Sequence, residues 1–240
     1  MDIVEFQKFL KERVILINYA SGCFGGFLTS VLYLSDNVWS TVPNDTPVFN
    51  YAGAAHTSVN VIENFHDRKS FDPWFALSYD KKLIYLWKNF LFKDIDPNMY
   101  YVQRLCSPKH HNEFSEFFNP NKTIIIKPNE KYRELIEKLV YHKILKDFEF
   151  EMWGNVKIPK KNGGEVMRRV IAKRTVKHFL DGTVYDQDFV IDFENFLDKD
   201  SFLTMMDRIK EKFNIEIDSE KLNVIYDAFY QANSRYINDH

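Results

Sequence analysis

The amino-acid sequence predicts an α/β fold in which helices flank a mostly parallel central sheet. Four apolar segments are predicted strands, at residues 14–17, 100–106, 123–127 and 188–193, and helical patterns lie between them. Strands that alternate with helices are typical of parallel sheets, because the connection between parallel strands is usually a helix. Ligands of such sheets bind at the carboxyl ends of the strands, so we expect function in the loops that follow these segments.

The first strand and the loop behind it are the most informative stretch of the chain. Residues 14–17 are an apolar run of the kind found in strands buried on both faces, and helical spacing begins at Phe27. The loop between them reads Ser21-Gly22-Cys23-Phe24-Gly25-Gly26 and holds three of the eight glycines of the chain. A strand, a glycine loop and a helix N-terminus bring backbone N–H groups together where the helix dipole favours negative charge. The loop is therefore a candidate phosphate or sulfate site.

Two common phosphate-binding motifs are excluded for this loop. A Walker A loop has a lysine directly after its last glycine, whereas here Phe27 follows Gly26. The dinucleotide-binding motif G-x-G-x-x-G has a glycine spacing that positions 22, 25 and 26 do not match. A strand-to-helix turn that needs glycine only for packing remains the alternative. Cys23 resembles a nucleophile, but no neighbour in the sequence supplies a base for it.

The other elements follow in order along the chain. Predicted helices are a short N-terminal amphipathic helix and the segments 27–32, 57–65, 112–118, 130–148, 165–180, 200–213 and 219–236. Residues 82–92 fit a strand or a helix equally, and residues 153–161 are expected to be irregular around Pro159. Asn129 and Ser219 are the expected N-caps of the helices that follow them.

Composition narrows the class of protein. The chain has 240 residues, enough for one large domain or two small ones, and we expect a single domain over residues 1–240. With 32 basic and 34 acidic side chains it lacks the field of a general nucleic-acid binder. Two cysteines are too few for a disulfide framework, which favours a cytoplasmic location. We find no signal peptide and no apolar run of membrane-spanning length.

Further candidates follow the second and third predicted strands. Lys109, His110 and His111 could supply a cation and a general base, or could form a solvated polar turn. Adjacent histidines rarely bind one metal ion, so we expect no metal. Lys127 ends the third strand and is a candidate for a second phosphate, whereas Lys131 and Arg133 fit a solvated helix face.

A basic stretch lies later in the chain. Residues 157–177 hold eight lysines or arginines and one acid, Glu165. The stretch could clamp a polyanion, or it could be a surface patch balanced by acids elsewhere.

Several of these residues together resemble a known family. The pattern Ser21-Gly22-x-x-Gly25-x-Phe27-Leu28, between a strand and a helix, resembles the phosphosulfate loop of the sulfotransferases. The order of later features is similar too: a histidine-bearing loop at 102–111, a strand ending in a basic residue and a proline at 123–128, and a late strand at 189–193. The chain departs from the family at Ala20, where a lysine or arginine is usual, and it lacks the terminal Arg-Lys-Gly segment.

The resemblance implies a P-loop nucleoside-triphosphate-hydrolase-like three-layer fold and a specific reaction. The enzyme would transfer a sulfuryl group from phosphoadenosine phosphosulfate (PAPS) to an unknown hydroxyl or amine acceptor, without a metal. The loop from Ser21 to Phe27, together with Lys127, would bind the nucleotide. His110 or His111 would accept the proton, with His110 favoured by its order in the chain, and Lys109 or Lys127 would balance charge. A phosphotransferase of the same fold and a non-catalytic binding module are the alternatives.

Overall fold

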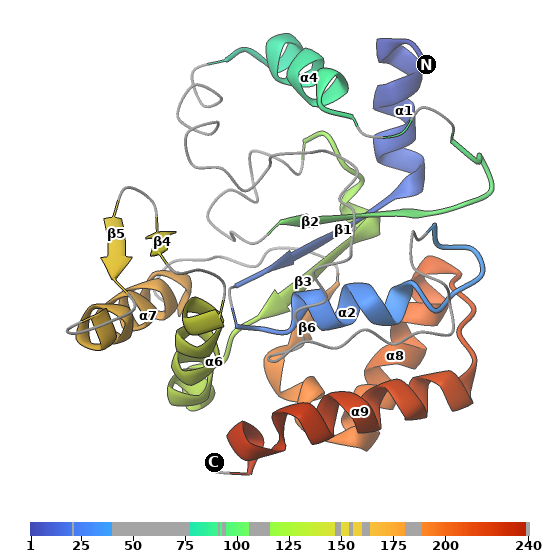
Figure 1. The fold of residues 1–240 in the computed structure, drawn as a ribbon. Helices are drawn as coiled ribbons and strands as arrows, with labels where there is room; N and C mark the ends of the chain where they lie inside the picture. Colours follow the sequence, from blue (N-terminus) through green and yellow to red (C-terminus); the bar gives the residue numbers. More distant parts are fainter. Residues whose placement is uncertain are drawn as a thin grey trace.

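A four-stranded parallel sheet forms the centre of the structure, which is a computed structural model (Figure 1). It describes residues 1–20, 22–39, 77–90, 92, 95–105, 116–146, 150–153, 156–159, 164–180 and 189–238. The strands are β1 (Val14–Tyr19), β2 (Tyr101–Leu105), β3 (Thr123–Lys127) and β6 (Val190–Asp192). Their order is β2-β1-β3-β6, and every pair is parallel. The predicted α/β class with a parallel sheet is confirmed.

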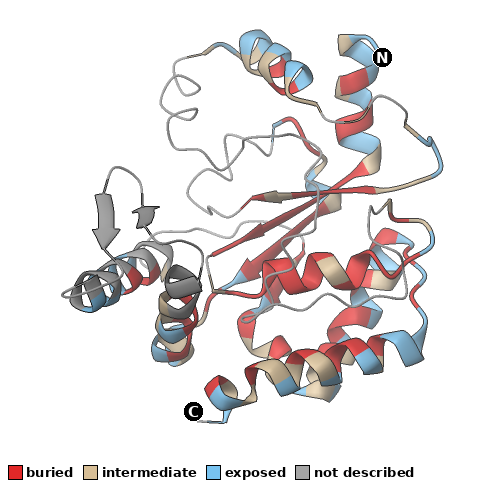
Figure 2. Ribbon diagram, in the orientation of Figure 1, coloured by how far each residue is buried: buried red, intermediate tan, exposed pale blue. Residues whose placement is uncertain are grey.

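Helices cover both faces of the sheet, which makes three layers (Figures 1 and 2). One face packs against α1 (Ile3–Arg13) and α4 (Tyr79–Lys88). The other packs against α2 (Gly25–Leu32), α8 (Lys199–Phe213) and α9 (Ser219–Ile237).

Side chains of β1 alternate between these two layers. Val14 and Leu16 belong to the cluster with α1 and α4, whereas Ile15 and Ile17 belong to the cluster with α2, α8 and α9. Because both faces are covered, all six residues of β1 are buried. The apolar run at the start of this strand therefore has the physical cause expected for a central parallel strand.

Two more helices and a hairpin lie beside the sheet. They are α6 (Arg133–Lys146), α7 (Gly164–Leu180) and the antiparallel pair β4 (Phe150–Trp153) and β5 (Val156–Pro159). Short 3-10 turns are η3 (Pro120–Lys122), η4 (Glu130–Tyr132) and η5 (Phe193–Phe196). Leu135, Ile136, Leu139 and Val140 of α6 are buried on one face, as their spacing predicts.

Most sequence predictions agree with these bounds; one ambiguity is resolved and three predictions need correction. The ambiguous residues 82–92 fall largely within helix α4. The stretch 153–161, expected to be irregular, contains β5, because residues 150–153 and 156–159 pair across the Gly-Asn dipeptide typical of hairpin turns. The N-cap of α9 is Asp218 rather than Ser219, since the Asp218 carboxylate accepts from the Glu220 and Lys221 N–H groups. Of the predicted helix 112–118, residues 116–118 form a turn; the rest, like 57–65, lies outside the described residues.

Candidate functional site

The glycine loop lies at the carboxyl end of the central strand. β1 is hydrogen-bonded to β2 on one side and to β3 on the other, and its last residue, Tyr19, pairs with Ile126 of β3. Beyond this strand, Gly22, Cys23 and Phe24 lead into α2, which begins at Gly25 (Figure 1). In open parallel sheets this edge is where ligands bind.

Two residues in the left-handed region make the bend. The Cys23 N–H donates to the Ala20 carbonyl at 3.0 Å, and Gly22 has a φ of 84°. A Cβ at Gly22 would lie 2.9 Å from Val140 Cγ2 and 3.1 Å from the Ile136 carbonyl oxygen, so only glycine fits between the bend and α6. Phe24, the N-cap of α2, has a φ of 58°, a conformation that costs a non-glycine residue about 1–2 kcal/mol.

Gly25 lets α2 approach the end of β1. A Cβ built on Gly25 would overlap carbons of the Tyr19 ring. The first residue of α2 is thus packed directly on the aromatic ring of the last residue of β1, and the glycine serves this contact. Gly25 is therefore required for packing, and its part in anion binding stays a prediction.

Aromatic packing holds the left-handed Phe24 in place. Its ring stacks on Phe193 with centroids 5.2 Å apart and meets the edge of Phe229 at 4.9 Å. Phe27 stacks on Phe229 at 3.9 Å, and both Phe27 and Cys23 are completely buried. The side chains at these candidate positions therefore belong to the core, so a ligand could use only backbone groups there.

The first turn of α2 is suited to an anion. An α-helix leaves its first N–H groups without an intrahelical acceptor, here beginning with those of Gly25 and Gly26, and the dipole makes this end positive. The first turn of α2 carries no acidic residue, and Phe24 provides no side-chain cap. Gly22 is partly exposed, whereas Gly25 and Gly26 are buried. These observations leave phosphate or sulfate binding by the loop as a prediction.

The burial of Cys23 bears on the nucleophile hypothesis. Reactive thiols are partly exposed, because the thiolate must reach its substrate. Cys23 is buried, so its position favours a structural role.

At the carboxyl end of β3 the basic residues differ in their surroundings. Lys127 is exposed and pairs in register with Asp192, the last residue of β6. Arg133 forms a two-pronged contact with Glu130, with nitrogen–oxygen distances of 2.5 and 2.9 Å. Lys131 lies 5.0 Å from the centre of the Tyr132 ring. Local partners therefore occupy Lys131 and Arg133, and Lys127 remains the candidate at this edge.

Asn129 shapes the turn after β3. Its side-chain oxygen accepts from the Lys131 N–H at 3.0 Å, which confirms it as an N-cap, here of η4. Its amide nitrogen donates to Glu194 at 3.3 Å and so connects the ends of β3 and β6.

Four of the candidate residues cannot be placed. Ser21, Lys109, His110 and His111 lie outside the described residues. Their roles in nucleotide binding, proton transfer and charge compensation stay predictions from the sequence.

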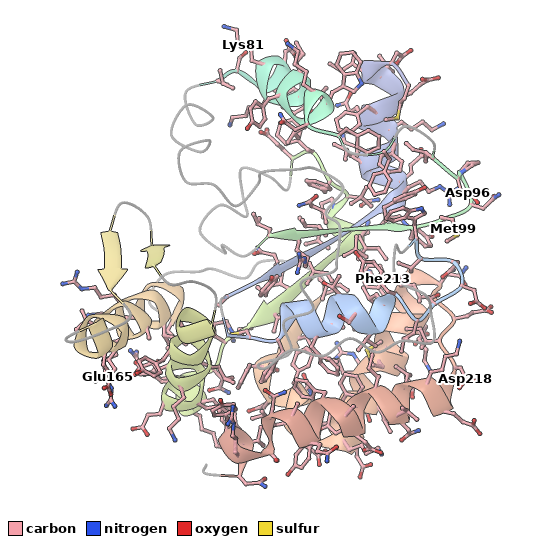
Figure 3. The ribbon with its side chains drawn as sticks, viewed as in Figure 1. Lys81, Asp96, Met99, Glu165, Phe213 and Asp218 are labelled. Carbon is pink, nitrogen blue, oxygen red and sulfur yellow. The ribbon has the colours of Figure 1, made fainter. Side chains whose placement is uncertain are left out.

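The basic stretch 157–177 contributes to a separate cleft between α6, α7 and the end of α9. The cleft has a volume of about 690 Å³ and is lined by Glu137, Lys138, Tyr141, Arg169, Lys173 and Arg235, among others. Arg169 forms an ion pair with Glu165 at 2.7 Å; Figure 3 labels Glu165 on α7. Acids therefore balance part of this charge.

One buried polar residue was missed by sequence reasoning. Asn18, in β1, is 1% exposed, and within the described part of the chain neither its amide nitrogen nor its amide oxygen has a hydrogen-bond partner. The signal in the sequence was a polar residue within an otherwise apolar strand.

The described residues contain neither a metal-binding group of side chains nor a helix that could span a membrane. No three histidine, cysteine, aspartate or glutamate side chains there are grouped to hold a metal ion. None of the helices in that part of the chain has the length and apolar content needed to span a bilayer.

Comparisons with known proteins give one structural similarity. No protein-family model matches the sequence, and no curated protein is significantly similar to it. Among solved structures, the chain is similar to the "Sulfotransferase Domain from the Curacin Biosynthetic Pathway", with 12% sequence identity and a TM-score of 0.40. The match covers 88% of this chain and 77% of that chain. The function proposed below therefore rests on the residues of this chain.

Proposed function

We propose that the protein is a sulfotransferase-like enzyme that transfers a sulfuryl group from phosphoadenosine phosphosulfate to a hydroxyl or amine acceptor. The observation that carries this proposal is the bend at the carboxyl end of β1, whose sequence resembles a phosphosulfate loop. Its side chains at 23 and 24 are packed into the core, and the helix that follows has no acid in its first turn. The bend thus offers an anion its backbone N–H groups and the positive end of the helix dipole.

Each proposed role follows from the chemistry of the group. The backbone N–H groups of Gly22, Phe24, Gly25 and Gly26 bind the phosphosulfate, while the Cys23 N–H holds the bend through the Ala20 carbonyl, and exposed Lys127 attracts a second phosphate. The acceptor oxygen or nitrogen bonds to sulfur while the bond from sulfur to the bridging phosphate oxygen breaks. His110 or His111 takes the acceptor proton, and Lys109 or Lys127 compensates the charge that develops on the leaving phosphate. The products are phosphoadenosine phosphate and the sulfated acceptor.

One observation favours a second candidate, a non-catalytic nucleotide-binding module. Ala20 occupies the position where sulfotransferases usually have a lysine or arginine, and it is completely buried. The loop therefore lacks the cation that would stabilise charge on the transferred group. Such a module would bind phosphoadenosine phosphate without turnover.

A thermal-shift experiment separates these functions, because a ligand of the folded state raises the unfolding temperature. We expect phosphoadenosine phosphate to raise it in a concentration-dependent way, and Lys127→Ala to weaken this effect. Lys131→Ala is the matched control, since Lys131 lies beside Tyr132 in the adjacent turn, and it should leave the effect unchanged. Stabilisation by ATP with magnesium alone would indicate a phosphotransferase, and no stabilisation by either nucleotide would refute nucleotide binding. Binding without sulfate transfer to any acceptor tested would favour the module.

A further inference from the structure

Asn18 is a buried amide whose two polar atoms have no hydrogen-bond partner among the residues that the structure describes. It is 1% exposed, and both Nδ2 and Oδ1 are unsatisfied. Such groups are rare in folded proteins, because burial removes the hydrogen bonds to water that the amide makes in the unfolded chain. An apolar residue of similar size would avoid this cost. A polar residue at this position therefore needs a reason other than stability.

Its place in the fold points to the ligand-binding edge. Asn18 is the second-last residue of β1 and pairs with Leu105 of β2 and Ile125 of β3, so it lies on the central strand beside the glycine loop. The alternation of β1 places Asn18 on the same face as Val14 and Leu16, which belong to the cluster formed with α1 and α4.

A neighbouring amide on that face is satisfied, which makes Asn18 distinct. Gln103 of β2 pairs with Leu16 and is equally buried, and its Nε2 donates to the Arg104 carbonyl at 3.0 Å. Burial on this face is therefore compatible with a satisfied amide.

The N-terminus of α2 and the side chain of Asn18 lie on opposite faces of the sheet, which suggests different roles for them. α2, whose N-terminus is proposed to hold the phosphosulfate, belongs to the cluster on the opposite face. Asn18 is therefore on the side of the loop away from α2. In an in-line transfer the attacking atom approaches opposite the leaving oxygen, so the side away from the phosphate is the side of the acceptor.

We propose that Asn18 is a binding residue for the reacting groups of the proposed sulfotransferase. Nδ2 donates a hydrogen bond to an oxygen of the sulfuryl group, and Oδ1 accepts one from the hydroxyl or amine of the acceptor. This assignment gives each unsatisfied atom a partner of the correct polarity. An amide donor is also a known means of stabilising charge on a transferred group. The inference rests on the proposed function.

The test compares two nucleotides that differ by the sulfuryl group. Calorimetric titration would measure the affinities of wild type and Asn18→Leu for phosphoadenosine phosphosulfate and phosphoadenosine phosphate. We expect Asn18→Leu to bind the phosphosulfate roughly ten- to a hundredfold more weakly, as for a lost hydrogen bond to a charged group, and to bind the phosphate as wild type does. Asn18→Ser, with a smaller side chain, serves if Asn18→Leu does not fold.

Asn233→Leu is the matched control. Asn233 is also a buried asparagine with an unsatisfied Oδ1, but it lies in α9 and its Nδ2 donates to the Phe229 carbonyl at 2.8 Å. This variant should leave both affinities unchanged.

The outcomes distinguish the inference from the proposed function. If wild type binds neither nucleotide, both are overturned. If wild type binds both nucleotides and Asn18→Leu weakens both equally or neither, the proposed function stands and the role of Asn18 is overturned. The buried amide would then be a structural feature, with an internal water as its partner.

Discussion

Gly25→Ala is expected to destabilise the protein, although alanine favours helices more than glycine does. The new Cβ would overlap the Tyr19 ring, which is itself buried. Overpacking of a core costs about 1–3 kcal/mol, and an overlap with ring carbons belongs at the upper end of this range. Subtracting the helix-propensity gain of about 1 kcal/mol leaves a net loss of about 2 kcal/mol in the free energy of unfolding. For a chain of this size we expect the unfolding temperature to fall by about 4–8 °C.

A double-mutant cycle identifies the cause of this loss. Urea unfolding followed by far-UV circular dichroism would measure the cost of Gly25→Ala in wild type and in a Tyr19→Ala background. Without the ring the new methyl group has space, so the cost should disappear or become a small gain. An equal cost in both backgrounds would refute the packing of α2 on Tyr19. A gain in wild type would refute it as well.

Three other substitutions test the surroundings of the site and the ends of the helices. Phe24→Ala removes the ring packed on Phe193 and Phe229 and should cost about 3–5 kcal/mol of unfolding free energy in urea. Asp218→Ala should lower stability near neutral pH, because the Lys221 and Glu220 N–H groups lower the pKa of this N-cap carboxyl. Its effect should shrink as the pH falls below the ordinary value of 3.8, where the wild-type carboxylate loses its advantage. Burial raises the pKa of Tyr33 to about 12, so ionisation of this phenol favours unfolding. The free energy of unfolding of the wild type should therefore fall by up to about 3 kcal/mol between pH 10 and about 12, and Tyr33→Phe should remove this fall.

Each of these has its own control. Val4→Ala is the control for Phe24→Ala; the Val4 side chain is 71% exposed, so its loss should change the free energy of unfolding by less than about 0.5 kcal/mol. A change as small as this for Phe24→Ala would contradict the packing of the bend. At Asp218, which Figure 3 labels, the variant Asp218→Asn keeps a capping oxygen without a titrating group. A pH dependence equal to that of wild type would contradict the role of the carboxylate. For Tyr33→Phe, an alkaline stability profile identical to that of wild type would show that this phenol does not titrate on unfolding.

Strands and helices with one consistent pattern could be predicted from the sequence. The run Thr-Ile-Ile-Ile-Lys has one interpretation, and the predicted bounds 123–127 are those of β3. Residues 82–92 had two interpretations, because an aromatic and apolar run fits a strand or a helix. Packing decided between them: Leu83 and Leu86 of α4 are buried beside α1. The β4–β5 hairpin was missed because its strands have four residues each, too few for a clear period.

The backbone of the candidate loop was more predictable than its packing. Clustered glycines indicated a tight bend, and a left-handed Gly22 agrees with this. The sequence could not show that Tyr19 lies on Gly25, or that Phe24 joins the core, because both contacts depend on how α2 folds back on the sheet. The unsatisfied state of Asn18 likewise depends on strands distant in the sequence.

The most direct test of nucleotide binding by the glycine loop is a residue-resolved titration. Backbone amide signals of the isotope-labelled protein would be followed by nuclear magnetic resonance as phosphoadenosine phosphate is added. We predict that the largest shifts are those of Gly22, Phe24, Gly25 and Gly26. Saturating shifts confined to the cleft that holds Lys138, Lys173 and Arg235, or no shifts at all, would contradict the account.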